Sequence, residues 1–160
     1  MDRDQEWNRE RVEAIAYALK DEPGALMPIL RQIQDELGWV PRDSVPLIAG
    51  ILNLSRAEVH GVVSFYHDFR HTPPGRTVVK VCRAESCQAI GGVALADHIR
   101  HRLGIDFGET SPDQRFTLEA VYCLGNCACS PAAVINDELI GRVTPASFDA
   151  AVTRYARPAR

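Results

Sequence analysis

The stretch VCRAESCQAIGG, residues 81–92, decides how the second half of this sequence is read, because its two cysteines join a strand pattern to a helix pattern. Residues 77–81 are short and rich in β-branched side chains, which predicts a strand. Apolar residues then recur at helical spacing, which predicts a helix ending near Gly104. The positions expected on the apolar side of that helix are Val93, Ala96, Ile99 and Leu103. Cys82 and Cys87 therefore fall where a strand ends and a helix begins.

A second cysteine group follows a second strand pattern. Residues 116–122 alternate in the manner of a half-buried strand. The positions expected on its inner face are Phe116, Leu118, Ala120 and Tyr122. Cys123, Cys127 and Cys129 come directly afterwards. If the two strands are parallel, as in a β-α-β unit, their ends emerge at one edge of the sheet. Two loops on that edge can then bring four sulfurs together.

The rest of this half completes a small mixed sheet. Residues 133–135 and 139–143 flank the turn formers Asn136-Asp137-Glu138, which predicts a hairpin. Thr144 and Pro145 are typical of a helix start, and the expected helix carries Phe148, Val152 and Tyr155. The order β-α-β-β-β-α predicts a mixed sheet with helices packed on it.

The first half of the chain shows helical periodicity throughout. Its amphipathic stripes predict four short helices in a small bundle. Gly38 stands where a left-handed cap would end the second helix, and Ser55-Arg56-Ala57-Glu58 is typical of a capping box. The fourth helix is expected to carry Val59, Val62, Val63 and Tyr66. Because the run HTPPG at 71–75 breaks the pattern, we expect an α+β protein with a helical domain over 1–72 and a sheet domain over 76–160.

Composition narrows the class of function. The chain has 160 residues, of which 46% are hydrophobic, and its formal net charge is −3. Nucleic-acid binding asks for a basic face, and a membrane span asks for about 18 apolar residues in a row; the sequence has neither. Residues 1–6 are polar and acidic, unlike a secretory signal, so we expect a cytoplasmic location. In such a reducing compartment, five cysteines suit a metal or redox role better than disulfides.

Four of these thiolates could hold one [2Fe–2S] cluster, because each iron then has four sulfur ligands. The cluster is anionic and needs hydrogen-bond donors nearby. Gly91-Gly92 and Gly125-Asn126 lie in the two loops, where glycine lets backbone amides approach sulfur without a Cβ in the way.

Three other interpretations of the cysteines stay open. A four-cysteine zinc site would use the same ligands, although structural zinc pairs are usually separated by two residues. A thioredoxin-type dithiol also wants two intervening residues, and Cys127-Ala128-Cys129 has one. Unliganded buried cysteines explain any single cysteine but poorly explain five in two loops.

No other motif points to catalysis by this chain. There is no G-x-G-x-x-G after a strand and no P-loop, so we expect neither NAD nor flavin to bind here. His67 and His71 are four residues apart but have no evident third ligand. His98 and His101 lie near a helix end, where cations suit the helix dipole. We therefore expect no catalytic residues.

The cysteine pairs and the helical lead resemble a known family. Cys82-x4-Cys87 and Cys123-x3-Cys127, with GALMPILRQIQDELGWVP (24–41) and LSRAEVHGVVSFYHDFR (54–70), are similar to the thioredoxin-like [2Fe–2S] subunit that accompanies the flavoprotein of respiratory complex I and related NAD-linked enzymes. The resemblance implies a thioredoxin-like domain whose cluster is held by Cys82, Cys87, Cys123 and Cys127. Cys129 departs from the family pattern, and the resemblance favours Cys127 as the fourth ligand.

The details of 81–92 and of YCLGNCACSPAAVI (122–135) are most similar to the gamma subunit of NAD-dependent formate dehydrogenase. That similarity implies a non-catalytic electron-transfer subunit. Its partners would be a flavoprotein subunit holding FMN, NAD and a [4Fe–4S] cluster, and a catalytic large subunit. The equivalent subunit of complex I or of an NAD-reducing hydrogenase is the alternative. A zinc-stapled interaction module is the alternative from another class.

Overall fold

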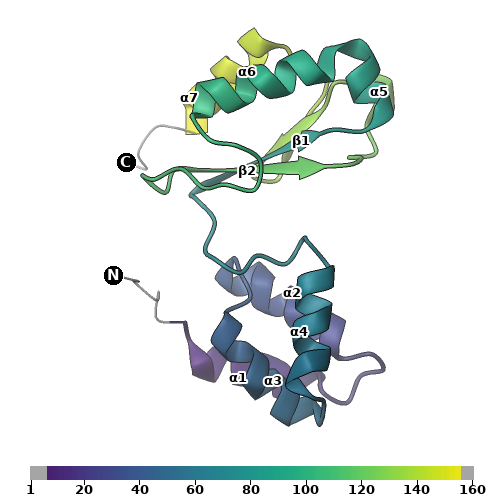
Figure 1. Ribbon diagram of the computed structural model, residues 1–160, viewed down its shortest axis with the longest axis vertical. Coiled ribbons are helices and arrows are strands. Elements are labelled where there is room, and N and C mark those ends of the chain that lie inside the picture. Colours follow the sequence, from purple (N-terminus) through teal and green to yellow (C-terminus); the bar gives the residue numbers. More distant parts are fainter. Residues whose placement is uncertain (1–6, 156–160) are drawn as a thin grey trace. The chain divides into compact units, whose positions relative to one another are not determined.

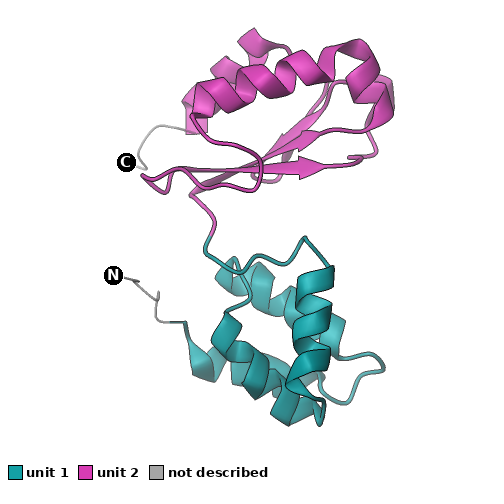
Figure 2. Cartoon of the chain, viewed as in Figure 1, with its two compact units in different colours: residues 1–73 teal, residues 74–160 magenta. Residues whose placement is uncertain are grey.

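Residues 7–155 are described by the computed structural model, in which the chain divides into two units, 1–73 and 74–160 (Figure 2). The first unit holds only helices and the second holds the sheet (Figure 1). The predicted domain bounds, 1–72 and 76–160, stay a prediction. None of the helices within residues 7–155 is long and apolar enough to cross a membrane.

Four α-helices build the first unit: α1 (Arg9–Leu19), α2 (Leu26–Leu37), α3 (Val45–Leu52) and α4 (Arg56–Phe65). A 3-10 turn, η1 (Arg42–Ser44), leads into α3. Their apolar stripes meet in one core, whose most buried large side chains are Val12, Ile15, Ile29, Leu30, Ile33, Val40, Ile48 and Val59. The helices form here because each one can bury its stripe against the others.

Two predicted helix boundaries in this unit are confirmed. Gly38 ends α2 with φ of 88°, and its N–H donates to the carbonyl of Gln34. At the start of α4, the N–H of Glu58 donates to Ser55 Oγ at 3.1 Å, and the N–H of Ser55 donates to Glu58 Oε2 at 2.8 Å. The placement of Tyr66 on α4 is wrong, because the helix ends at Phe65 and Tyr66 is extended.

The second unit is built on a four-stranded sheet in the order β2-β1-β3-β4. The strands are β1 (Thr77–Cys82), β2 (Phe116–Val121), β3 (Ala133–Ile135) and β4 (Glu138–Ile140). β1 and β2 are parallel, with Cys82 opposite Val121, whereas β1–β3 and β3–β4 are antiparallel. The hairpin is thus confirmed, although its second strand begins at Glu138 rather than Leu139 and ends at Ile140.

Helices cover one face of this sheet (Figure 1). The connection from β1 to β2 contains α5 (Glu85–Cys87), the π-helical turn η2 (Gln88–Gly92) and α6 (Val93–Leu103). A 3-10 turn, η3 (Cys127–Cys129), follows β2. The last helix, α7 (Pro145–Tyr155), follows the hairpin. The core between sheet and helices holds Val79, Val81, Leu95, Ile99, Leu118, Ile135, Phe148 and Val152. The predicted mixed α+β architecture is confirmed.

Two side chains expected in this core lie outside it. Val93 is 48% exposed, and Leu95 is buried in its place, since non-helical dihedrals at Ile90 and Gly91 break the helical run just before α6. Tyr122 is 77% exposed, because β2 ends one residue earlier at Val121.

Candidate metal centre

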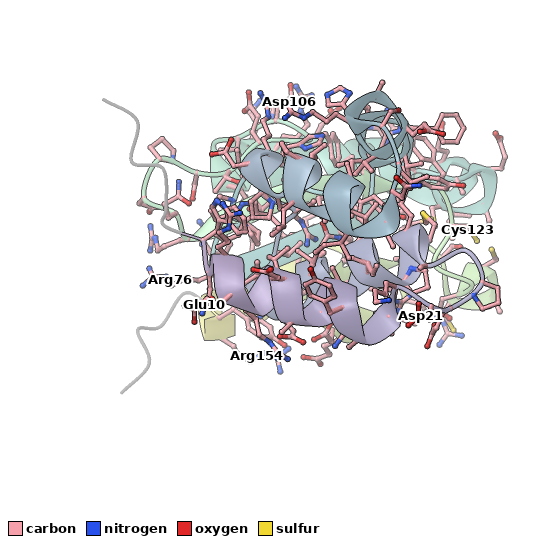
Figure 3. All side chains as sticks on the ribbon, turned by 90° about the horizontal axis from the view of Figure 1, so that it is seen from below. Glu10, Asp21, Arg76, Asp106, Cys123 and Arg154 are labelled. Atoms are coloured by element: carbon pink, nitrogen blue, oxygen red, sulfur yellow. The ribbon has the colours of Figure 1, made fainter. Side chains whose placement is uncertain are left out.

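The parallel pairing of β1 and β2 brings the two cysteine loops to one edge of the sheet. Cys82 is the last residue of β1, and Cys87 is the last residue of α5, the short helix that begins three positions after Cys82. Cys123 follows the end of β2, and Cys127 begins η3. Figure 3 labels Cys123. The arrangement expected from a β-α-β unit is therefore the observed one.

The four thiols come together as two pairs. Cys123 Sγ lies 3.9 Å from Cys127 Sγ. Cys82 and Cys87 lie close enough for each thiol to affect the pKa of the other, and Cys87 in turn affects the pKa of Cys127. Within residues 7–155 no group of three or more His, Cys, Asp or Glu side chains is gathered around one point as a single metal ion would require. A binuclear cluster asks for two thiolates at each iron, and the paired arrangement fits that demand.

The two pairs differ in burial. Cys82 and Cys87 are 4% and 2% exposed, whereas Cys123 and Cys127 are exposed. Burial raises the pKa of Cys82. For Cys87, burial also opposes ionisation, but the Ser130 hydroxyl, the Cys82 thiol and the Ala132 N–H together lower its pKa. The pKa of Cys127 is raised because Cys123 is its neighbour.

Backbone amides surround the sulfurs. The N–H of Gly125 donates to Cys123 Sγ at 3.3 Å, as expected for a glycine in that loop. The backbone groups of Ala84 and Leu124 favour the ionised form of Cys82. Donors of this kind suit a sulfur-rich group with net negative charge, so the residues present fit a [2Fe–2S] cluster.

Gly92 also has a steric role that the sequence patterns did not indicate. A Cβ at this position would lie 2.4 Å from the carbonyl oxygen of Cys87, so no side chain fits there. Gly92 therefore permits the tight turn that carries Cys87.

Two serines beside the cysteines escaped the sequence patterns. Ser130 is buried, and its Oγ lies 3.4 Å from Cys87 Sγ and donates to the carbonyl of Cys127 at 2.9 Å. Ser86 Oγ lies 3.0 Å from Ser130 Oγ. The only hint in the sequence is that each serine directly adjoins a cysteine, Ser86 before Cys87 and Ser130 after Cys129.

Cys129 is half-buried at the far end of η3. Its carbonyl accepts the N–H of Arg142 at 2.6 Å, and a Cβ on Gly141 would lie 2.7 Å from the Cys129 Cβ. Cys129 thus packs against the chain that follows β4.

The two histidines on α6, His98 and His101, each have a polar partner within the protein, so neither needs a metal ion to account for its position. His98 Nε2 lies 3.0 Å from Asp149 Oδ1, and His101 Nδ1 lies 2.7 Å from the carbonyl of Asp97.

A mixed sheet with two thiol pairs at one edge defines a small iron–sulfur protein of the ferredoxin class. A profile of the thioredoxin-like [2Fe–2S] ferredoxin family matches residues 12–156, and the chain belongs to that family. It carries a [2Fe–2S] cluster, which supplies one-electron chemistry when bound. The resemblance noted in the sequence is thereby confirmed for the family, and it favours iron–sulfur over zinc.

Relatives come from two kinds of oxidoreductase. The chain is 36% identical over 140 residues to a subunit of the NADH-quinone oxidoreductase of Pseudomonas aeruginosa, covering 88% of this chain and 84% of the relative. It is 31% identical to a subunit of the NADP-reducing hydrogenase of Solidesulfovibrio fructosivorans, covering 86% and 81%. A crystal structure of an NAD+-reducing [NiFe]-hydrogenase superposes with a TM-score of 0.70 at 26% identity, covering 85% of this chain and 23% of that chain.

Proposed function

We propose that Cys82, Cys87, Cys123 and Cys127 hold the cluster and that the chain exchanges single electrons with a flavoprotein subunit of an NAD-linked oxidoreductase complex. The observation that carries this proposal is the meeting of two thiol pairs at one sheet edge, with one pair, Cys123 and Cys127, exposed to solvent. NAD exchanges two electrons as hydride, whereas the cluster takes one at a time. A flavin can accept two electrons and release them singly, so a one-electron centre is useful beside it.

The chain's own residues hold and screen the electron carrier rather than transform a substrate. Sulfur ligands and the amides around them set how readily the cluster accepts an electron. We assign no catalytic residue to this chain and place it in the cytoplasm, with the flavoprotein subunit and a catalytic large subunit as partners.

For the parent complex we propose NAD-dependent formate dehydrogenase. The support is the similarity of 81–92 and 122–135 to the gamma subunit of that enzyme. The second candidate is complex I or an NAD-reducing hydrogenase, which the names of the relatives favour. Formate oxidation itself would belong to another subunit in either case.

The test is to tag this chain in its native cells and purify the complex without oxygen. The preparation is assayed for NAD+ reduction with formate, for NAD+ reduction with hydrogen, and for quinone reduction with NADH. We expect formate-dependent activity only. Hydrogen-dependent activity or quinone reduction would assign the chain to the second candidate instead.

The cluster is tested separately by EPR spectroscopy of the purified chain. We expect a silent oxidised state and a rhombic S = 1/2 signal after reduction with dithionite, since one reduced [2Fe–2S] centre has one unpaired electron. A colourless zinc-containing protein without this signal would contradict the proposal.

A further inference from the structure

The helical unit contains a pocket that the cluster chemistry does not use. Its volume is about 560 Å³, within the range of sites for small molecules. The lining is formed by residues from the segment before η1, from η1 and α3, from α4 and from the segment after α4: Val40, Arg42, Val45, Pro46, Arg56, Ala57, His60, Val63 and His71.

The floor of this pocket is apolar. Val40 is fully buried, and Val45 and Val63 are 8% and 2% exposed. The N–H of Val40 donates to the carbonyl of Arg70 at 2.8 Å, which fixes the segment before η1 against the segment that carries His71. The turn at Arg42 is held by Ser44, whose buried hydroxyl donates to the carbonyl of Pro41 at 2.6 Å. The pocket walls are therefore braced by hydrogen bonds.

The rim is cationic. Arg42, Arg56 and His60 are exposed, and His71 is half-buried. Arg42 and His60 lie close enough to His71 that, together with burial as the larger cause, they lower its pKa. None of these four side chains forms a salt bridge with an acidic group in the described part of the chain. The guanidinium groups of Arg42 and Arg56 thus place positive charge at the edge of an apolar hollow, with no salt-bridged partner among residues 7–155.

We propose that this pocket binds a small phosphate monoester that has a compact apolar body. Two guanidinium groups offer the forked donors that match phosphate oxygens, and the imidazoles add further donors. A dianion balances such a rim better than a single carboxylate does. The valine floor takes the apolar part of the ligand, since burying it removes apolar surface from water.

The experiment uses calorimetric titration of the full chain with its cluster. Phenyl phosphate is the probe, while inorganic phosphate and phenol each supply one half of it. We expect saturable binding of phenyl phosphate, with inorganic phosphate weaker and phenol without measurable affinity. Absence of saturable binding at millimolar phenyl phosphate would overturn the proposal, as would equal binding of phenol.

Variants locate the site. Arg42→Gln and Arg56→Gln should each weaken phenyl phosphate binding by about tenfold, because each removes a charge-assisted hydrogen bond. Arg31→Gln is the matched control: Arg31 lies on α2, outside the pocket, and pairs with Asp35 at 3.6 Å. Its affinity should equal that of the unchanged chain. Thermal unfolding checks that each variant is folded, and Arg56 opens α4, where a positive charge does not help the helix. Equal affinity in Arg56→Gln and Arg31→Gln would contradict the assignment.

Discussion

At the scale of single residues, the ligand assignment is open to direct test. Replacing Cys82, Cys87, Cys123 or Cys127 singly by serine should abolish or shift the visible and EPR spectra, because a hard oxygen replaces a soft thiolate. Iron and sulfide are measured in the anaerobically purified variants. We expect both to fall in each of the four.

Cys129→Ser is the matched control for that series. Cys129 shares η3 with Cys127 but packs against Gly141, so its iron and sulfide content should stay near that of the unchanged chain. The assignment is wrong if Cys129→Ser loses the cluster while Cys127→Ser keeps it.

Gly92 offers a second test at this scale, which acts on the backbone rather than on sulfur. In Gly92→Ala the new methyl group would meet the carbonyl of Cys87, so the turn must shift. We expect a loss of about 1–3 kcal/mol in the free energy of unfolding, as for other overpacked sites, together with lower cluster occupancy.

Gly61→Ala controls for the change of residue type. Gly61 lies on α4 with open space around it, and alanine is the better helix former by about 1 kcal/mol. This variant should be at least as stable as the unchanged chain and should keep its cluster. A Gly92→Ala protein with full cluster content would show that the turn tolerates a side chain.

At the scale of elements, the start of α4 depends on its capping box. Ser55→Ala removes the acceptor of the Glu58 N–H and should cost about 0.5–2 kcal/mol, measured by chemical denaturation. Ser64→Ala is the control, because its hydroxyl donates back to the His60 carbonyl within the same helix. An equal loss in both variants would contradict a specific effect of the cap.

The same cap gives a pH dependence. The N–H and hydroxyl of Ser55 hold the pKa of Glu58 below its usual value. A depressed folded-state pKa stabilises the folded protein above the pKa of the unfolded chain, and that stability is lost as pH falls through the folded value. The difference in stability between the unchanged chain and Glu58→Gln, measured by chemical denaturation at several pH values, should therefore shrink in acid.

Element ends show how far the sequence predicts the structure. The caps at Gly38 and Ser55 are confirmed because their signals are local: a left-handed residue and a pair of reciprocal hydrogen bonds. The expected burial of Tyr122 is wrong, because alternation along the sequence does not reveal that β2 ends at Val121. The expected burial of Val93 is wrong, because helical spacing does not reveal the kink at Ile90 and Gly91, which changes the side of α6 that faces the core. Likewise, cysteines mark a site by their own chemistry, whereas Ser130 is 43 positions after Cys87 and reaches it only once the intervening chain has folded.

At the scale of the whole molecule, each unit has its own hydrophobic core. The fragment 74–160 contains the whole sheet and all five cysteines, so we expect it to fold and to keep its cluster after residues 1–73 are deleted. Its visible spectrum is compared with that of the full chain. A fragment that unfolds or loses iron would show that the helical unit is needed to protect the sheet unit.

Co-expression of the same fragment with the flavoprotein subunit asks what the helices add. Their apolar stripes are used in their own core. The helical unit is a docking element if the pair falls apart while the fragment keeps its cluster. If the fragment co-purifies fully with the flavoprotein subunit, the sheet unit alone is sufficient for docking.

The unequal burial of the two thiol pairs has a consequence for how the protein is made. If the cluster is transferred from a donor protein, its ligands must be exchanged in turn. We expect solvent-exposed Cys123 and Cys127 to meet the incoming cluster first, and Cys82 and Cys87 to engage afterwards from their buried positions. Assembly of the cluster then has a fixed order. Variants without the exposed pair are expected to take up no cluster from a donor, whereas variants without the buried pair are expected to take one up and lose it again.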